Sequence, residues 1–335
     1  MTVCVAGLLQ GSAMADSISP ASFSAMLAEG ESATVHKMVT VSAGTPTSSK
    51  VDVFFLADET GSMGGIIDAV KTSASTILSS TAGLGDVAFG VGGYRDVGDA
   101  FVYRELTDLT TDQPTAQAAI NTWSASGGGD APEAQLYALE QLATGTSWRA
   151  GSERIAVWFG DYPGHDPSVG GITEAAATAA LQAQSIAVQA ISVGANQLDS
   201  TGQATRITAA TGGTFYSGIS TDDIVDTIQA AITTAVETYT TVGLDLLEVP
   251  AGVTAVAVPA SYVGSYDRSI ERVFNFDLTF TMDTAGTYGF NIYGTVDGGR
   301  VATEADSLSV VPVPGALLLG MLGLSVAGVR LRKRA

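Results

Sequence analysis

Apolar residues in the middle of the chain follow two alternating patterns. Continuous apolar runs, typical of strands buried on both faces of a sheet, cover 51–57, 86–94, 154–159, 186–193 and the short stretch 214–216. Apolar residues recur at helical spacing over 66–78, 116–123, 133–142, 174–183, 203–210 and 222–236. This alternation predicts an α/β fold with a doubly wound, mostly parallel sheet and right-handed crossovers. In such sheets, ligands bind at the carboxyl ends of the strands.

After about residue 240 the pattern changes to short alternating stretches rich in Val, Thr, Tyr and Gly, with turn signals at 283–286 and 297–299. This pattern of short alternating stretches and turns predicts an antiparallel β-sandwich. A similar strand, 33–41, lies before the α/β region. Because an isolated strand cannot bury a face, we expect it to join the later strands. The α/β region would then be an insertion, entered near residue 49 and left near 241.

The two ends of the chain have the character of export signals. An apolar stretch at 3–9 precedes Ala13-Met14-Ala15, a pattern typical of signal-peptide cleavage. Near the other end, the apolar run 315–329 is shorter than the roughly 20 residues of a full membrane span. The predicted organisation is a signal peptide 1–15, a β segment 16–49 that joins the sandwich, an α/β domain 50–240, the sandwich 241–311 and a C-terminal segment 312–335.

Composition and charge exclude several classes of binding site and partner. Acidic residues outnumber basic ones by 34 to 15, which gives a formal charge of −19. Such a chain repels phosphate backbones, so we expect no nucleic-acid partner. One cysteine rules out an intrachain disulfide, and two histidines rule out a site built on several His ligands or a Cys/His zinc cluster. Binding of a divalent cation remains compatible with this composition.

Three polar loops follow strands of the predicted sheet or open its helices. Asp58, Thr60 and Ser62 come directly after the first buried strand, and their spacing of two lets a tight loop turn all three oxygens toward one point. Carboxylate and hydroxyl oxygens are hard ligands that suit Mg²⁺. Glu133 opens a helix after a glycine-rich loop, and Asp161 ends a second strand. Helix capping alone would also explain the first two loops, and Asp161 alone could be an ordinary loop residue, but together the three loops favour a metal site.

The stretch from about 50 to 240 resembles a von Willebrand factor A domain, in particular the integrin β-subunit type. The segments that carry the resemblance are 58–63, 130–133 and Asp161 after 157–160. The resemblance implies a metal-ion-dependent adhesion site for Mg²⁺, with Mn²⁺ as a substitute ion. Its ligands, direct or through water, would be Asp58, Thr60, Ser62 and Glu133, with Asp161 in an outer position.

The same resemblance implies a neighbouring Ca²⁺ site. Asp96, Asp130, the carbonyl of Pro132 and Glu133 match most of its positions. The family also uses an asparagine where this chain has Gly128. The sequence therefore leaves open whether a second ion binds.

The C-terminal segment resembles the PEP-CTERM class of bacterial sorting signals in its VPxP variant. The residues that carry the resemblance are Val311, Pro312, Pro314, Arg330, Arg332, Lys333 and Arg334. It implies partners in the export and sorting machinery, transient anchoring in the inner membrane, and removal of the tail by an exosortase-type enzyme. The protein would then reach the cell surface or extracellular matrix of a Gram-negative bacterium. An ordinary membrane anchor is the alternative.

These features predict an exported adhesion protein rather than an enzyme. A protein or acidic-polysaccharide ligand would supply a carboxylate to the metal, and no covalent chemistry is required. The alternatives are a structural matrix component without a specific ligand and a metal-dependent hydrolase. His165, four residues after Asp161, is the only plausible general base for a hydrolase.

Overall fold

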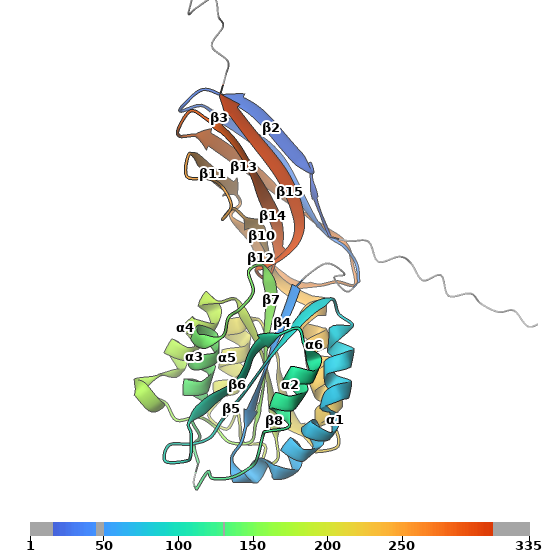
Figure 1. Cartoon of the computed structure of the whole chain (residues 1–335), viewed down its shortest axis with the longest axis vertical. Coiled ribbons are helices and arrows are strands. Elements are labelled where there is room, and N and C mark those ends of the chain that lie inside the picture. The colour runs from blue at the N-terminus through green and yellow to red at the C-terminus, as the bar shows by residue number, and fades with distance from the viewer. Residues whose placement is uncertain (1–15, 45–49, 130, 311–335) are drawn as a thin grey trace, which may run out of the picture.

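The computed structural model describes residues 16–44, 50–129 and 131–310, which form an α/β unit and a β-sandwich (Figure 1). The predicted signal peptide and C-terminal sorting segment lie outside these residues, as does Asp130. In the part of the chain that is described, no helix has both the length and the apolar character needed to cross a membrane.

A six-stranded sheet in the order β6-β5-β4-β7-β8-β9 forms the centre of the α/β unit. Its strands are β4 (Lys50–Asp58), β5 (Asp86–Tyr94), β6 (Tyr103–Thr110), β7 (Ser152–Gly160), β8 (Ile186–Val193) and β9 (Phe215–Ile219). All neighbours pair in parallel except β5 and β6. The doubly wound, mostly parallel sheet predicted from the sequence is therefore confirmed.

Helices cover both faces of this sheet (Figure 1). They are α1 (Gly64–Ala82), α2 (Gln113–Ile120), α3 (Gln135–Gly145), α4 (Glu174–Ala183), α5 (Gln203–Thr211) and α6 (Ile224–Glu237), with short 3₁₀ helices η1 (Gly61–Met63) and η2 (Val169–Gly171). One core packs α1, α2 and α6 against the sheet, and a second core packs α3, α4 and α5 against the opposite face. Because both faces are covered, the central strands are apolar throughout, as their sequences predicted.

Two parts of the α/β unit differ from the sequence-based prediction. Strand β6 was not predicted, because its sequence YRELTDLT interleaves charges and its residues are mostly half-buried at the sheet edge. Helix α2 begins and ends three residues earlier than expected. Asp112 caps it by accepting a hydrogen bond from the backbone N–H of Thr115, and a proline stands in its first turn.

The β-sandwich consists of two sheets, β1-β3-β13-β11 and β12-β10-β14-β15-β2. Their strands are β1 (Ser17–Ser19), β2 (Ser22–Leu27), β3 (Ser32–Val41), β10 (Thr238–Asp245), β11 (Val253–Val258), β12 (Ser261–Asp267), β13 (Arg272–Met282), β14 (Thr287–Val296) and β15 (Gly299–Val310). Alternate residues of β13 point into an aromatic and aliphatic core. One pairing departs from the predicted antiparallel pattern, since β2 runs parallel to β15.

Strand β3 pairs with β13 over ten residue pairs, from Val41 with Arg272 to Ser32 with Thr281. The strand expected over 33–41 thus lies in the same sheet as strands that follow the α/β unit. The whole α/β unit is inserted between β3 and β10 (Figure 1). Two chain connections, rather than one, join the units.

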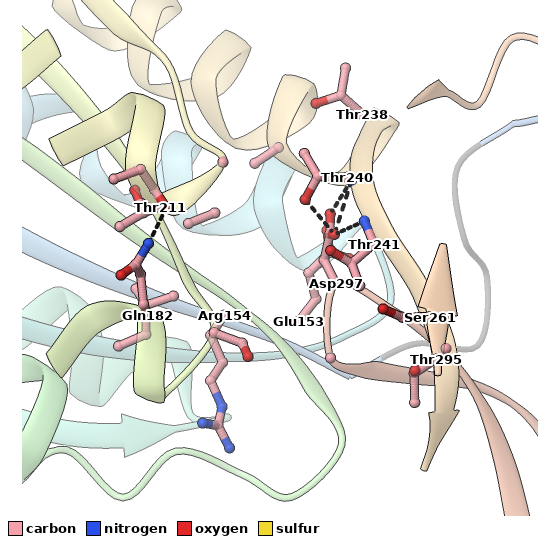
Figure 2. Close-up of a pocket in the computed structure, with 18 of the residues that line it drawn as sticks. Glu153, Arg154, Gln182, Thr211, Thr238, Thr240, Thr241, Ser261, Thr295 and Asp297 are labelled. Carbon is pink, nitrogen blue, oxygen red and sulfur yellow. Dashed lines mark hydrogen bonds between the residues drawn. The ribbon is translucent and has the colours of Figure 1, made fainter. Parts of the chain in front are cut away.

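Beside the junction with the α/β unit, polar contacts within the sandwich tie the β14–β15 turn to the start of β10 (Figure 2). Asp297, in the β14–β15 turn, accepts hydrogen bonds from the backbone N–H groups of Thr240 and Thr241 and from the Thr240 hydroxyl, at 2.7–3.2 Å. Helix α6 ends at Glu237 and β10 starts at the next residue. A cleft of about 410 Å³ lies here, and none of the predicted metal-site residues lines it.

Candidate metal centre

Strand β4 delivers Asp58 to the carboxyl edge of the sheet, where a tight loop leads into α1 (Figure 1). Asp58 Oδ1 accepts hydrogen bonds from the Thr60 backbone N–H at 2.9 Å and from the Thr60 hydroxyl at 2.7 Å. The Thr60 and Ser62 hydroxyl oxygens are 3.4 Å apart. Asp58 and Thr60 are buried, whereas Ser62 is exposed. The loop therefore gathers three oxygen-bearing side chains, with Ser62 on the solvent side.

Asp161 joins this group from the neighbouring strand. It is the first residue after β7, which pairs in parallel with β4. The Ser62 hydroxyl donates a hydrogen bond to Asp161 Oδ1 at 3.1 Å, across 99 residues of sequence. The parallel pairing of β4 and β7 is what brings these two loops together.

Glu133 reaches the site by a route that the sequence did not predict. It was expected inside a helix, but α3 begins only at Gln135. Glu133 instead forms an isolated parallel bridge with Gly164. Its backbone N–H donates to the Pro163 carbonyl, and its backbone carbonyl accepts from the His165 N–H, both at 2.9 Å. Its side chain is buried, and Oε2 has no hydrogen-bond partner. This backbone bridge, rather than a helix, sets the position of the carboxylate.

The glycine-rich loop before Glu133 packs directly on the Asp58 loop. The Gly61 N–H donates to the Gly127 carbonyl at 3.0 Å. Gly128 has φ of +65°, and a Cβ there would lie 2.7 Å from Thr60 Cβ and 3.2 Å from Glu133 Oε1. A side chain at this position would be strained and would push both candidate ligands apart.

We expect Gly128→Ala to lower the affinity for Mg²⁺ about tenfold or more, equivalent to about 1.4 kcal/mol. The reason is that the added methyl group displaces Thr60. Gly129→Ala is the matched control, because a Cβ at Gly129 meets nothing within 4 Å. Titration calorimetry measures both variants. Equal Mg²⁺ affinities of the two variants would contradict this reading of the loop.

Burial raises the pKa values of the carboxyl groups of the site, and for Asp58 and Glu133 neighbouring carboxylates add to the effect. Burial and nearby charges raise the pKa of Glu133 to about 8, and burial raises that of Asp58 to about 7. The charges that act on Glu133 all belong to carboxylates, namely those of Asp58, Asp96, Asp161 and Asp99. Burying several like charges together is costly, and a divalent cation among them would reverse that cost.

The donor set fits a hard divalent cation. Within the described ranges, no three His, Cys, Asp or Glu side chains form a metal-binding group by themselves. Binding therefore depends on the hydroxyls of Thr60 and Ser62 together with the carboxylates. The unpaired, buried Oε2 of Glu133 is the kind of atom that a metal or its bound water would satisfy. Oxygen ligands of this type suit Mg²⁺.

The residues expected to hold Ca²⁺ are only partly assembled. Asp96 lies near enough to Glu133 to raise its pKa, but His165 Nε2 lies 3.2 Å from Asp96 Oδ1. Sequence reasoning missed Asp99, whose Oδ2 accepts from the N–H groups of Gly128 at 2.9 Å and Asp96 at 3.3 Å. Asp130 is not among the described residues, and Pro132 directly precedes Glu133. A second ion thus stays a prediction.

Glu59 is a further residue that the sequence did not single out. It stands between Asp58 and Thr60, yet its carboxylate is buried away from them. It forms two hydrogen bonds with the Arg104 guanidinium and accepts another from the Ser124 N–H at 2.9 Å. The Arg95 side chain donates to the Glu59 carbonyl at 3.0 Å. Glu59 therefore fixes the Asp58 loop to β6 and to the segment after α2.

The fold and site together define a doubly wound α/β domain with a hydroxyl–carboxylate cluster at the carboxyl edge of its sheet. The family profile of the von Willebrand factor type A domain matches residues 52–231, more than half of the chain. The chain belongs to this family.

Comparison with solved structures gives matches of low identity. A von Willebrand factor type A protein from Catenulispora acidiphila is 14% identical, with a TM-score of 0.48, over 90% of this chain and 75% of that one. Proximal thread matrix protein 1 from the mussel byssus is 16% identical, with a TM-score of 0.46, over 59% of this chain and 48% of its own. No curated protein matches the chain.

Proposed function

We propose that this protein is an exported binding module that holds its ligand through Mg²⁺. The observation that carries the proposal is the meeting of three loops at one edge of the sheet. Asp58, Thr60 and Ser62 lie on one loop, Asp161 on the second and Glu133 on the third. Ser62 is the solvent-exposed member, so a ligand would approach from its side.

Each residue has a separate part in this proposal. The Thr60 and Ser62 hydroxyls and the Glu133 carboxylate would hold the ion, directly or through water. Asp58 orients Thr60 through two hydrogen bonds, and Asp161 orients Ser62 through one. The bound ion would supply a positive centre for a carboxylate of a protein or an acidic polysaccharide. The surrounding protein surface would set specificity.

A hydrolase is the weaker alternative. His165 lies beside the site, but its Nε2 is 3.2 Å from Asp96 Oδ1, which favours a role in orienting that carboxylate. A purely structural matrix component would keep the same fold without a specific ligand. We therefore propose a binding module rather than an enzyme.

A pull-down from the native matrix tests the function. Immobilised wild-type protein should retain a partner in Mg²⁺, release it on addition of chelator, and bind it again when Mg²⁺ is restored. Asp58→Ala should retain nothing under any of these conditions. Retention that is indifferent to chelator and to Asp58 would contradict binding through the metal site. Failure to retain any partner would support the structural alternative, and turnover of esters, phosphates or peptides would support the hydrolase.

Export and sorting form a separate proposal that rests on the two ends of the sequence. We expect protein released from the cells to begin after residue 15 and to lack Arg330, Arg332, Lys333 and Arg334. Mass spectrometry of extracellular protein gives both ends. Recovery of an intact C-terminal peptide that contains these basic residues would point to an ordinary anchor instead of a sorting signal.

A further inference from the structure

A lysine and two carboxylates lie in the core of the β-sandwich, in a different structural unit from the metal site. Lys37 is on β3, in one sheet, and Glu304 and Asp306 are on β15, in the other (Figure 1). Their side chains face each other between the sheets. All three have side-chain exposures of 0%.

The contacts within this group are close. Lys37 Nζ is in direct contact with Glu304 Oε1, and it lies 3.8 Å from Asp306 Oδ1. The ring of Phe23 is 5.6 Å from Nζ, so the surroundings are apolar. Glu304 Oε2 and both carboxylate oxygens of Asp306 lack a hydrogen bond of normal geometry, although the Phe23 backbone N–H is near enough to favour the charged form of Asp306.

An ion pair accounts poorly for this arrangement. One ammonium group cannot neutralise two carboxylates, and charges in an apolar core lose more hydration energy than a single contact returns. Transfer of the ammonium proton to a carboxylate leaves a neutral amine beside a neutral acid, which the apolar surroundings favour. A buried primary amine in contact with a carboxylic acid, shielded from water, is the reactant pair for an amide bond. Exclusion of water also opposes the reverse hydrolysis.

We propose that Lys37 and Glu304 form an intramolecular isopeptide bond that joins the two sheets of the sandwich. The lone pair of Lys37 Nζ attacks Cδ of the protonated Glu304 carboxyl, and an N–C bond forms. A proton passes from the nitrogen to the Asp306 carboxylate, which then delivers it to the hydroxyl oxygen on Cδ. The C–O bond breaks, one water leaves, and Asp306 regains its charge. The step needs no oxidant and no other co-reactant.

The pKa values of the group agree with these roles. Burial lowers the pKa of Lys37 to about 8, so a fraction of the amine is neutral near neutral pH. Burial also raises the pKa of Asp306, which suits a carboxylate that accepts and returns a proton.

The bond would have a definite consequence for the architecture. Residues 37 and 304 are 267 positions apart, and the α/β unit lies between them. A covalent link would join the two sheets of the sandwich. A pulling force on the metal site would then pass from the α/β unit into a sandwich whose sheets cannot separate.

Peptide mapping by tandem mass spectrometry of the purified full chain tests the proposal. The expected result is a branched peptide that joins the Lys37 segment to the Glu304 segment, with a mass lower than the sum of the two by one water. Because the chain has a single cysteine, no intrachain disulfide can imitate this link. Recovery of unmodified Lys37 and Glu304 in separate linear peptides would overturn the proposal.

Two variants separate the chemistry from the fold. Asp306→Asn keeps the size of the side chain but removes the proton relay. We therefore expect a folded protein without the link, whose mass is not reduced by one water and which yields only linear peptides. Asp277→Asn is the control, because Asp277 on β13 pairs with His36 on the exposed side of the sheet that holds Lys37, and it should leave the link intact. If the fraction of protein with the Lys37–Glu304 bond were the same in Asp306→Asn as in the wild type, Asp306 would have no part in forming the bond.

Discussion

Asp58→Ala should abolish tight Mg²⁺ binding and leave the fold intact. Among the described residues, Asp58 supplies the only carboxylate that hydrogen-bonds to Thr60, at 2.7 and 2.9 Å. Its removal also takes a negative charge from the cluster that would attract the cation. The fold should survive, because burial already raises the pKa of Asp58 to about 7 and makes its charged form costly.

Titration calorimetry with Mg²⁺ and circular dichroism check this expectation together. Asp68→Ala is the matched control, since Asp68 is an exposed carboxylate on the helix that follows the loop. The control should bind Mg²⁺ as the wild type does. Unchanged Mg²⁺ affinity in Asp58→Ala, with a native circular dichroism spectrum, would show that the loop is not the metal site.

Lys37→Met is expected to lower the free energy of unfolding of the sandwich by about 3–5 kcal/mol. The substitution removes the Lys37 nitrogen and leaves the Glu304 and Asp306 carboxyl groups buried without that polar partner, since both have side-chain exposures of 0%. Loss of the proposed covalent link acts in the same direction. Denaturant unfolding of the full chain measures the change.

The neighbouring residue provides the control for this prediction. His36 faces outward, and its pair with Asp277 is 59% and 63% exposed. His36→Ala should therefore leave the unfolding midpoint unchanged within error, because exposed pairs contribute little. An unfolding midpoint of Lys37→Met equal to that of His36→Ala would contradict the importance of the buried group.

The convergence of Asp58, Thr60, Ser62 and Asp161 was predictable from the sequence. Each follows a continuous apolar run, and such runs are central strands whose carboxyl ends share one edge of the sheet. Glu133 was placed correctly near this edge, but for the wrong reason. Its bridge to Gly164 pairs two loops, and no periodic pattern marks a contact of that kind.

The buried group in the sandwich had a sequence signal that was overlooked. Lys37 is in phase with Val35, Val39 and Val41, two residues apart along the strand, and so lies on the inward face of its strand. Glu304 and Asp306 likewise share a face with Leu308. A charged residue in phase with the apolar positions of a strand marks a buried polar group, but only the sheet pairing shows which charges meet.

Crystallography with Mn²⁺ in place of Mg²⁺ tests the metal site most directly. Anomalous scattering locates the ion independently of any assumption about its ligands. We expect a strong peak beside Ser62 and Thr60, within direct or water-bridged reach of Glu133, and no such peak in Asp58→Ala. A peak at another place on the α/β unit, or none at saturating Mn²⁺, would contradict this expectation.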